Sequence, residues 1–252
     1  MSNNENTTAL ILAAGIGKRL RGMTDIPKSL LKIEDETLLA RHVRIWRNQG
    51  IKNIVAVLGY QKELIEEELS KVASDMNITV VVNEDPVSYG NTFSLWLGLK
   101  ACKPSNIVVF DADLAYDESV VADFLQAGDF GRILVGPSSL DDIECAKALV
   151  DYNDMVRLTV DKRAVSKEEL EQYSFSGEAV GALWFSASQA RSLNETCQAF
   201  LAIEKNQPLN WEHVMNVYLK EHDLKSFQVG PGRWIEIDTS EDYEKAVALF
   251  KE

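Results

Sequence analysis

The sequence predicts an α/β fold with a doubly wound, mainly parallel sheet that is flanked by helices. Short apolar runs alternate with segments whose apolar residues recur every three or four positions, as in repeated strand–helix–strand units. The chain has 252 residues, of which 46% are hydrophobic, so it can bury a sizeable core. Because no linker, repeat or low-complexity tract is visible, we expect one domain over residues 1–252.

The first half of the chain shows the strand–helix alternation most clearly. The expected strands are residues 8–12, 53–58, 78–82 and 107–110. The helices between them are marked by Leu39, Val43 and Trp46, by Ile65, Leu69 and Val72, and by residues 93–101. Gly50 can end the first of these helices in a left-handed conformation.

Beyond Asp113 the alternation weakens, which predicts a mixed sheet with shorter connections. The strands expected there are residues 133–136, 148–152, 156–160, 181–185 and 234–237. Residues 211–221 are expected to form a helix. Thr239 and Asp242 have the spacing of a capping box for a last helix that continues through Phe250.

Composition excludes several classes of protein. A net charge of -13 argues against sequence-independent binding of nucleic acid, which needs an excess of Lys and Arg. The three widely spaced cysteines, Cys102, Cys145 and Cys197, predict buried free thiols. The first residues resemble no secretory signal, and no apolar run reaches membrane-spanning length. We therefore expect a cytoplasmic protein without membrane insertion, and the sequence leaves open whether it forms a homodimer.

A glycine-rich and basic loop follows the first expected strand. Gly15 and Gly17 allow close approach of the backbone to a ligand, and free amides in such a turn bind anions. Lys18, Arg19, Arg21 and Lys28 concentrate positive charge in an otherwise acidic chain. The spacing fits neither the dinucleotide fingerprint nor the Walker A loop, so the loop by itself predicts only phosphate binding.

The loop resembles the signature of the sugar-phosphate and related nucleotidyltransferases, L-A-A-G-x-G-x-R-L followed by P-K. The resemblance implies a Rossmann-like nucleotidyltransferase fold whose first half, residues 1–140, binds the nucleotide, while residues 141–252 bind the acceptor. It also implies that Arg19 neutralises the departing pyrophosphate and that Lys28 contacts the reacting phosphates. The loop residues assigned to the nucleotide are Leu12, Ala13, Ala14, Gly15 and Gly17.

Acidic residues at two strand ends are candidates for a magnesium site. Asp111 and Asp113 follow the strand at 107–110, where ligands bind in open α/β sheets, and carboxylates suit Mg²⁺. The resemblance assigns the metal to Asp113 and to Asp238, although Asp238 has the alternative of capping the last helix. Asp111 either orients the nucleotide or caps the turn. Glu236 shares a strand face with Asp238 and is a secondary candidate on the acceptor side.

Asn83, Asn91 and Ser94 lie in a segment similar to the N…N-x-[FY]-S-L pattern of the CTP:phosphocholine cytidylyltransferases and their phosphonate and inositol-phosphate relatives. This resemblance favours cytidine, with Asn83 or Asn91 near the base. Asn91 has the alternative of capping the helix that begins at Thr92.

For the acceptor, the resemblance favours Lys162 against the phosphate, with Lys147 as the second choice. Glu178, Trp211 and Glu212 are candidates for a pocket that takes a cationic head group. Their alternatives are a surface cation for each lysine and a core position for the tryptophan.

These features together predict a magnesium-dependent cytidylyltransferase that moves CMP from CTP to a small phosphate or phosphonate acceptor and releases pyrophosphate. A phosphate oxygen is largely ionised at neutral pH, so the attack on the α-phosphorus needs no general base. A sugar-1-phosphate uridylyl- or thymidylyltransferase is the alternative enzyme. A nucleotide-sensing regulatory subunit is the non-enzymatic alternative.

Overall fold

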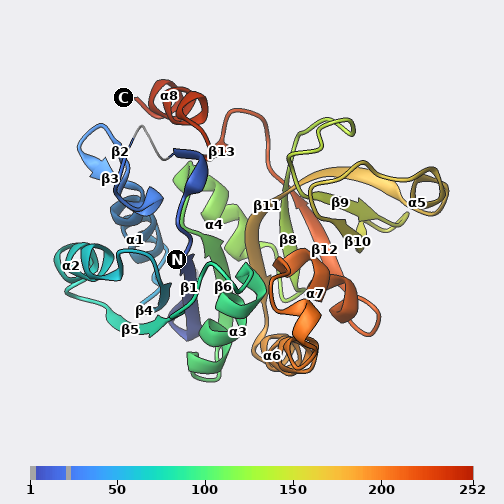
Figure 1. Ribbon diagram of the computed structural model, residues 1–252, viewed down its shortest axis with the longest axis horizontal. Helices are drawn as coiled ribbons and strands as arrows, with labels where there is room; N and C mark the ends of the chain where they lie inside the picture. The colour runs from blue at the N-terminus through green and yellow to red at the C-terminus, as the bar shows by residue number, and fades with distance from the viewer. Residues whose placement is uncertain (1–3, 21–23, 252) are drawn as a thin grey trace.

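A nine-stranded mixed sheet forms the centre of the protein, seen here in a computed structural model that describes residues 4–20 and 24–251 (Figure 1). In sheet order the strands are β5 (Asn77–Val82), β4 (Asn53–Leu58), β1 (Thr7–Ala13), β6 (Asn106–Asp111), β11 (Ser174–Phe185), β8 (Arg132–Gly136), β12 (Leu224–Gln228), β10 (Met155–Val160) and β9 (Lys147–Val150). The expected α/β class is confirmed.

The first four strands of this order, β5, β4, β1 and β6, pair in parallel. Helices α1 (Leu38–Asn48), α2 (Lys62–Val72) and α3 (Asn91–Ala101) make the crossovers between them. Every residue of β1 is buried, which explains its unbroken apolar and small sequence. Because the strands are parallel, their carboxyl ends share one edge of the sheet, where α/β proteins bind ligands.

The second half of the chain extends the sheet with mixed pairing. β11 is antiparallel to both β6 and β8, and β12 returns parallel to β8. β10 is antiparallel to β12 and β9. β11 begins at Ser174, whereas the sequence predicted that this strand begins at residue 181. Its register with β8 shifts between Ala179 and Leu183.

Helices cover both faces of the sheet and bury one apolar cluster on each. The other helices are α4 (Glu118–Gln126), α5 (Lys167–Gln172), α6 (Ala187–Leu201), α7 (Trp211–Tyr218) and α8 (Ser240–Leu249). Trp46 of α1, Leu69 of α2 and Phe124 of α4 belong to one cluster. Leu95 of α3, Leu193 of α6 and Val214 of α7 belong to the other, and this covering of both faces is the doubly wound arrangement.

Two small ribbons lie outside the main sheet. β2 (Lys32–Ile33) pairs with β3 (Glu36–Thr37), and β7 (Leu114–Tyr116) pairs with β13 (Trp234–Glu236), all antiparallel. The β7–β13 ribbon joins the segment after β6 to the end of the chain. In the described part of the chain no helix has the length and apolar character needed to cross a bilayer.

Some expectations differ from the structure in detail. The helix expected over residues 211–221 ends at Tyr218, and Cys102 is half-buried where a buried thiol was expected. Cys145 and Cys197 are buried, and all three thiols are free. Arg21 lies outside the described residues.

Candidate active site

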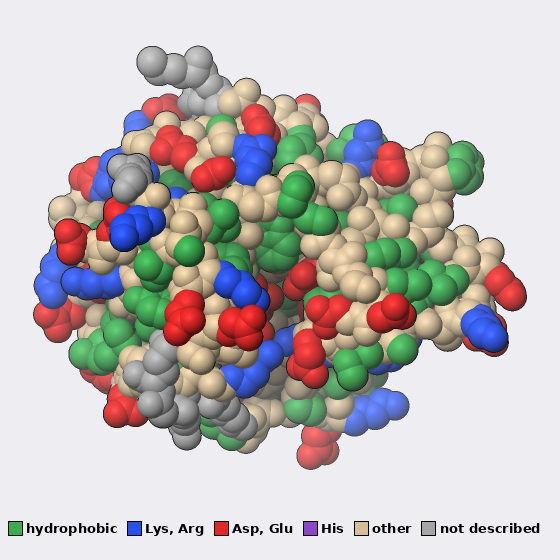
Figure 2. Space-filling view, turned by 90° about the horizontal axis from the view of Figure 1, so that it is seen from above, with side chains coloured by type: hydrophobic (Ala, Val, Ile, Leu, Met, Phe, Trp, Pro, Cys, Tyr) green, Lys and Arg blue, Asp and Glu red, His purple; other side chains and the backbone are tan. Residues whose placement is uncertain are grey.

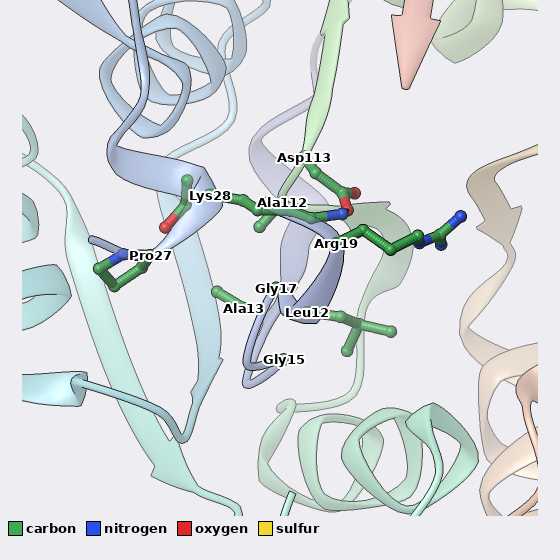
Figure 3. Close-up of a pocket in the computed structure, with 10 residues that line it drawn as sticks. Leu12, Ala13, Gly15, Gly17, Arg19, Pro27, Lys28, Ala112 and Asp113 are labelled. Carbon is green, nitrogen blue, oxygen red and sulfur yellow. The ribbon is translucent and has the colours of Figure 1, made fainter. Parts of the chain in front are cut away.

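A pocket of about 290 Å³ opens at the carboxyl ends of β1 and β6 (Figure 3). Its walls combine the loop after β1, the Pro27–Lys28 segment and the turn after β6. The lining residues are Leu12, Ala13, Gly15, Gly17, Arg19, Pro27, Lys28, Ser29, Ala112 and Asp113. The structure therefore brings the glycine loop, both predicted catalytic cations and the first predicted metal ligand to one cavity.

The two glycines of the loop, Gly15 and Gly17, differ in backbone conformation and in the space around them. Gly17 has a φ of +57°, and a Cβ on it would lie 3.3 Å from Cγ of Lys28. Apart from its two chain neighbours, no residue that the structure describes has an atom within 4 Å of the place of a Cβ on Gly15, so a side chain there would enter open space beside the pocket. The backbone of Ala14, which is buried, holds the adjoining segment through a hydrogen bond from Tyr60 N to its carbonyl at 3.2 Å.

Lys28 joins the two predicted metal ligands in the structure. Its Nζ donates to Asp113 Oδ2 at 2.8 Å and to Asp238 Oδ1 at 2.5 Å. Figure 3 shows this side chain reaching across the pocket towards Asp113. Burial alone would lower the pKa of the Lys28 ammonium group, but the charges of Asp113 and Asp238 outweigh it and raise that pKa.

Arg19 completes this group of charges from the outer side. Its Nη2 lies 2.6 Å from Asp238 Oδ2, and its side chain is 45% exposed, compared with 16% for Asp238. Burial raises the pKa of the Asp238 carboxyl, but Lys28 and Arg19 bring the pKa below its ordinary value. Both carboxylate oxygen atoms of Asp238 thus have a cationic partner.

The β7–β13 ribbon brings Asp113 and Asp238 together from distant parts of the sequence. The ribbon ends next to both residues, and Ile237 N donates to the Asp113 carbonyl at 3.0 Å. Thr239 is the N-cap of α8 and forms the expected capping box with Asp242. The alternative that Asp238 caps this helix is therefore wrong, which leaves its side chain for the pocket.

Glu236 lies with Asp113 and Asp238. One carboxylate oxygen from each of the three residues lies within 4.8 Å of the others. Burial, followed by the charges of Asp113 and Asp238, raises the pKa of Glu236 well above its ordinary value. Three oxygen donors beside a phosphate-sized pocket form a donor set that suits Mg²⁺.

A second pocket, of about 520 Å³, shares Arg19 with the first pocket and has a strongly acidic lining. Its residues are Arg19, Asp142, Glu144, Cys145, Glu178, Trp234, Ile235, Glu236, Asp238, Thr239 and Asp242. Burial, and then the charge of Asp142, raises the pKa of Glu178 to about 7. In Figure 2, acidic and basic side chains surround a hollow on the face seen from above.

The sequence matches a known family over most of its length. The family model of the MobA-like NTP transferase domain matches residues 9–164. The chain belongs to this family. It is therefore a nucleotidyltransferase, as the glycine loop and the P-K segment predicted.

Individual relatives of this nucleotidyltransferase cover nearly the whole chain. It is 24% identical to the choline-phosphate cytidylyltransferase of Streptococcus pneumoniae over 245 residues, which are 96% of this chain and 98% of the relative. It is also 24% identical to the 2-aminoethylphosphonate cytidylyltransferase of Lancefieldella rimae, with coverages of 94% and 91%. The structure of the inositol-1-phosphate CTP transferase from T. maritima superposes with a TM-score of 0.75 at 20% identity and coverages of 97% and 96%, which supports the fold.

The two asparagines predicted to lie near the base are Asn83, which follows β5, and Asn91, which begins α3. Asn83 is 1% exposed and donates from Nδ2 to Ser94 Oγ at 3.1 Å. Asn91 is the first residue of α3, where Gly90 is the N-cap, and its Oδ1 accepts from Trp211 N at 2.7 Å. Asn91 thus satisfies a backbone amide at the start of α7, and the idea that it caps its own helix is wrong.

Asp111 ends β6 beneath the site. Burial, and then the charge of Asp113, raises its pKa well above the ordinary value. A Cβ on Gly181, where φ is +60°, would lie 2.4 Å from Asp111 Oδ2, so the carboxyl packs directly on the β11 backbone. Asp111 therefore lies close to Asp113 and is not one of the three grouped oxygen donors.

The two predicted acceptor lysines differ in placement. Lys147 is 0% exposed, and its Nζ donates to the carbonyls of Cys145 at 3.2 Å and Arg163 at 3.1 Å. Lys162 is exposed, has a φ of 42°, and its charge lowers the pKa of Glu178. Lys162 is thus the lysine whose ammonium group is accessible beside the acidic pocket.

Trp211 and Glu212 begin α7 and are both buried. Trp211 is 2% exposed and belongs to the apolar cluster on that face. Glu212 is 6% exposed, its Oε2 has no hydrogen-bond partner among the described residues, and burial raises its pKa to about 7. Several lining residues of the acidic pocket were not predicted as site residues. Asp142 and Trp234 are among them, and an acidic run and an aromatic residue at a strand start mark these two in the sequence.

Proposed function

We propose that this nucleotidyltransferase is a magnesium-dependent cytidylyltransferase that transfers CMP from CTP to a small phosphate or phosphonate acceptor and releases pyrophosphate. One observation carries the proposal. Lys28 and Arg19 line the first pocket together with Asp113 and the glycine loop, and their charged atoms lie 2.5 to 2.8 Å from those of Asp113 and Asp238.

The two cations address the main obstacle to this reaction, which is the repulsion between two anions. An acceptor oxygen attacks the α-phosphorus of the nucleotide, and a new P–O bond forms as the bond to pyrophosphate breaks. We assign the mostly buried Lys28 to neutralise the reacting phosphates and the more exposed Arg19 to neutralise the departing pyrophosphate. Because a phosphate or phosphonate oxygen is already ionised near neutral pH, no side chain has to remove a proton.

The grouped oxygen atoms of Asp113, Glu236 and Asp238 support the magnesium proposal. Burial, and then the charges of Asp113 and Asp238, raise the pKa of Glu236, so a positive charge beside the three carboxylates would stabilise their ionised forms. Bound there, Mg²⁺ would neutralise and align phosphate oxygens. Asp113 and Asp238 are the proposed ligands, and Glu236 is a third oxygen donor beside them.

Similarity to relatives named as cytidylyltransferases over more than 90% of the chain supports CTP as the donor. The proposed nucleotide site is the first pocket, where the backbone of Leu12, Ala13, Gly15 and Gly17 faces the cavity. We assign residues 1–140 to the nucleotide and residues 141–252 to the acceptor.

The acidic second pocket favours an acceptor that carries a cationic nitrogen next to its phosphate or phosphonate. Glu178 and Asp142 supply negative charge, Trp234 supplies an aromatic wall, and Lys162 lies near them for the anionic end. An acceptor with an uncharged polyol next to its phosphate would bring no positive charge to these carboxylates. Relatives named for choline phosphate and 2-aminoethylphosphonate agree with this preference.

The test is to incubate the protein with Mg²⁺, each of the nucleoside triphosphates and a panel of acceptors, and to follow pyrophosphate release. The panel contains phosphocholine, 2-aminoethylphosphonate, a polyol phosphate and a sugar-1-phosphate. We expect release only with CTP and fastest with the amine-bearing acceptors. Release only with a sugar-1-phosphate and UTP or dTTP would contradict the proposal, and so would activity that survives removal of Mg²⁺ by a chelator.

A further inference from the structure

The carboxylates proposed to hold the metal already have cationic partners from the chain itself. Asp238 Oδ1 lies 2.5 Å from Lys28 Nζ, and its Oδ2 lies 2.6 Å from Arg19 Nη2. Asp113 Oδ2 accepts from the same Lys28 Nζ at 2.8 Å. Three of the four oxygen atoms of these two residues are therefore paired with a lysine or arginine side chain.

A lysine ammonium and a divalent ion would compete for these carboxylates. An ion held by Asp113 and Asp238 would lie close to the Lys28 ammonium group, because that group contacts both side chains. Their like charges would repel each other in a partly buried site, where screening by water is weak. The metal can bind well only after Lys28 has moved.

The surroundings show where Lys28 would go. The same first pocket is lined by Lys28, Arg19 and the glycine loop, so the phosphates of a bound nucleotide would lie within reach of both cations. Arg19 is largely exposed and can move with little loss of packing. Phosphate oxygens offer the two side chains an anionic partner that replaces the carboxylates.

We propose that Lys28 and Arg19 act as internal counter-cations that keep Asp113 and Asp238 closed to divalent ions until the phosphates of the nucleotide draw them away. The metal then enters together with the nucleotide, and the free protein has little affinity for the metal alone. This inference rests on the proposed function, because it assumes that Asp113 and Asp238 hold the metal.

Binding of Mn²⁺, measured by electron paramagnetic resonance, tests the inference without any turnover. We would titrate the wild type, Lys28→Met and Lys28→Gln with Mn²⁺, each with and without an α,β-methylene analogue of CTP. Lys103→Met, an exposed lysine outside both pockets, is the control for the loss of one positive charge. Asp113→Asn in the Lys28→Met background locates the ion.

Without nucleotide, we expect Lys28→Met and Lys28→Gln to bind Mn²⁺ at least about tenfold more tightly than the wild type. We expect Lys103→Met to match the wild type, and Asp113→Asn to remove the gain. Equal Mn²⁺ affinity of wild type and both Lys28 variants would overturn the inference. So would wild-type protein that binds Mn²⁺ as tightly without nucleotide as with it, a result that needs no variant to fold. Absence of Mn²⁺ binding in all samples, including those with nucleotide, would instead contradict the proposed metal site itself.

Discussion

Replacing Asp113 by asparagine removes one charge from the centre of the proposed site and leaves the shape of the side chain almost unchanged. Asp113 is 20% exposed and lies 2.8 Å from Lys28 Nζ, so its charge acts in a partly desolvated setting. Opposite unit charges about 4 Å apart attract by roughly 4 kcal/mol at an effective dielectric constant near 20. Each 1.36 kcal/mol corresponds to about a tenfold change in rate, so losing this charge next to the reacting phosphates should lower kcat/KM by about 10³-fold.

The assay is pyrophosphate release at saturating Mg²⁺ with CTP and the best acceptor from the panel. The fold should survive, because Asp113 takes part in the architecture through its backbone carbonyl, which accepts from Ile237 N. Asp123→Asn makes the same chemical change on α4 at a side chain that is 63% exposed, and it should retain full activity. If Asp113→Asn keeps kcat/KM within tenfold of the wild type, the reasoning about the metal ligands is refuted.

Three further predictions concern the acceptor, pH and the glycine loop. Glu178→Gln should raise KM about tenfold for an amine-bearing acceptor and leave KM for CTP unchanged. Glu195→Gln, at an exposed position of α6, is the control. An acceptor KM of Glu178→Gln equal to that of the wild type, or a similar rise in Glu195→Gln, would contradict the acceptor assignment. The pKa of Glu178 is about 7 in the folded protein and ordinarily 4.5, so the folded state binds a proton at this side chain more tightly than the unfolded state does. The resulting stabilisation of the fold is complete below about pH 4.5 and is lost as the pH rises through 7. Between about pH 5 and pH 8, calorimetry should show that the Tm of the wild type falls by several degrees more than the Tm of Glu178→Gln. An equal fall in Tm for the two proteins would refute this prediction. Gly15→Ala should leave Tm unchanged, since the new Cβ would meet no described atom within 4 Å beyond its chain neighbours. It should raise KM for the nucleotide about tenfold, because the methyl group narrows the pocket. A KM equal to that of the wild type would show that the nucleotide does not approach Gly15.

The first half of the fold was predictable because buried parallel strands have continuous apolar sequences. The strand at residues 53–58 coincides with β4, and its neighbours differ by one or two residues at their ends. β5 is an exception in burial only, since it lies at the edge of the sheet and most of its residues are partly or fully exposed. Edge strands are covered on fewer sides, which the apolar run at residues 78–82 does not reveal.

The second half was harder because its strands contain polar residues that serve the site or the surface. β11 starts seven residues before the predicted strand, since Ser174, Ser176 and Glu178 interrupt the apolar pattern. α6 was not predicted although Ala190, Leu193 and Cys197 recur at helical spacing, because polar residues dominate between them. β12 was also missed, since it contributes few buried side chains.

The geometry of the candidate site followed from the sequence only in part. The motif identified Arg19, Lys28, Asp113 and Asp238, and the structure brings all four together. Sequence could not show that Lys28 pairs with both carboxylates, because that contact depends on how the β7–β13 ribbon places the last strand. It also could not show that Asn91 serves the start of α7, since that contact spans 120 residues.

The β7–β13 ribbon has a consequence for when the protein becomes functional during its synthesis. The nucleotide loop and Asp113 are complete once the first half of the chain has left the ribosome, and the parallel strands around them can pair early. Asp238 is made 125 residues after Asp113, and β13 must then pair with β7 before the charged side chains can meet. A chain interrupted before β13 would lack Asp238, the second carboxylate that Lys28 contacts, so the charge cluster is complete only after β13 has paired with β7.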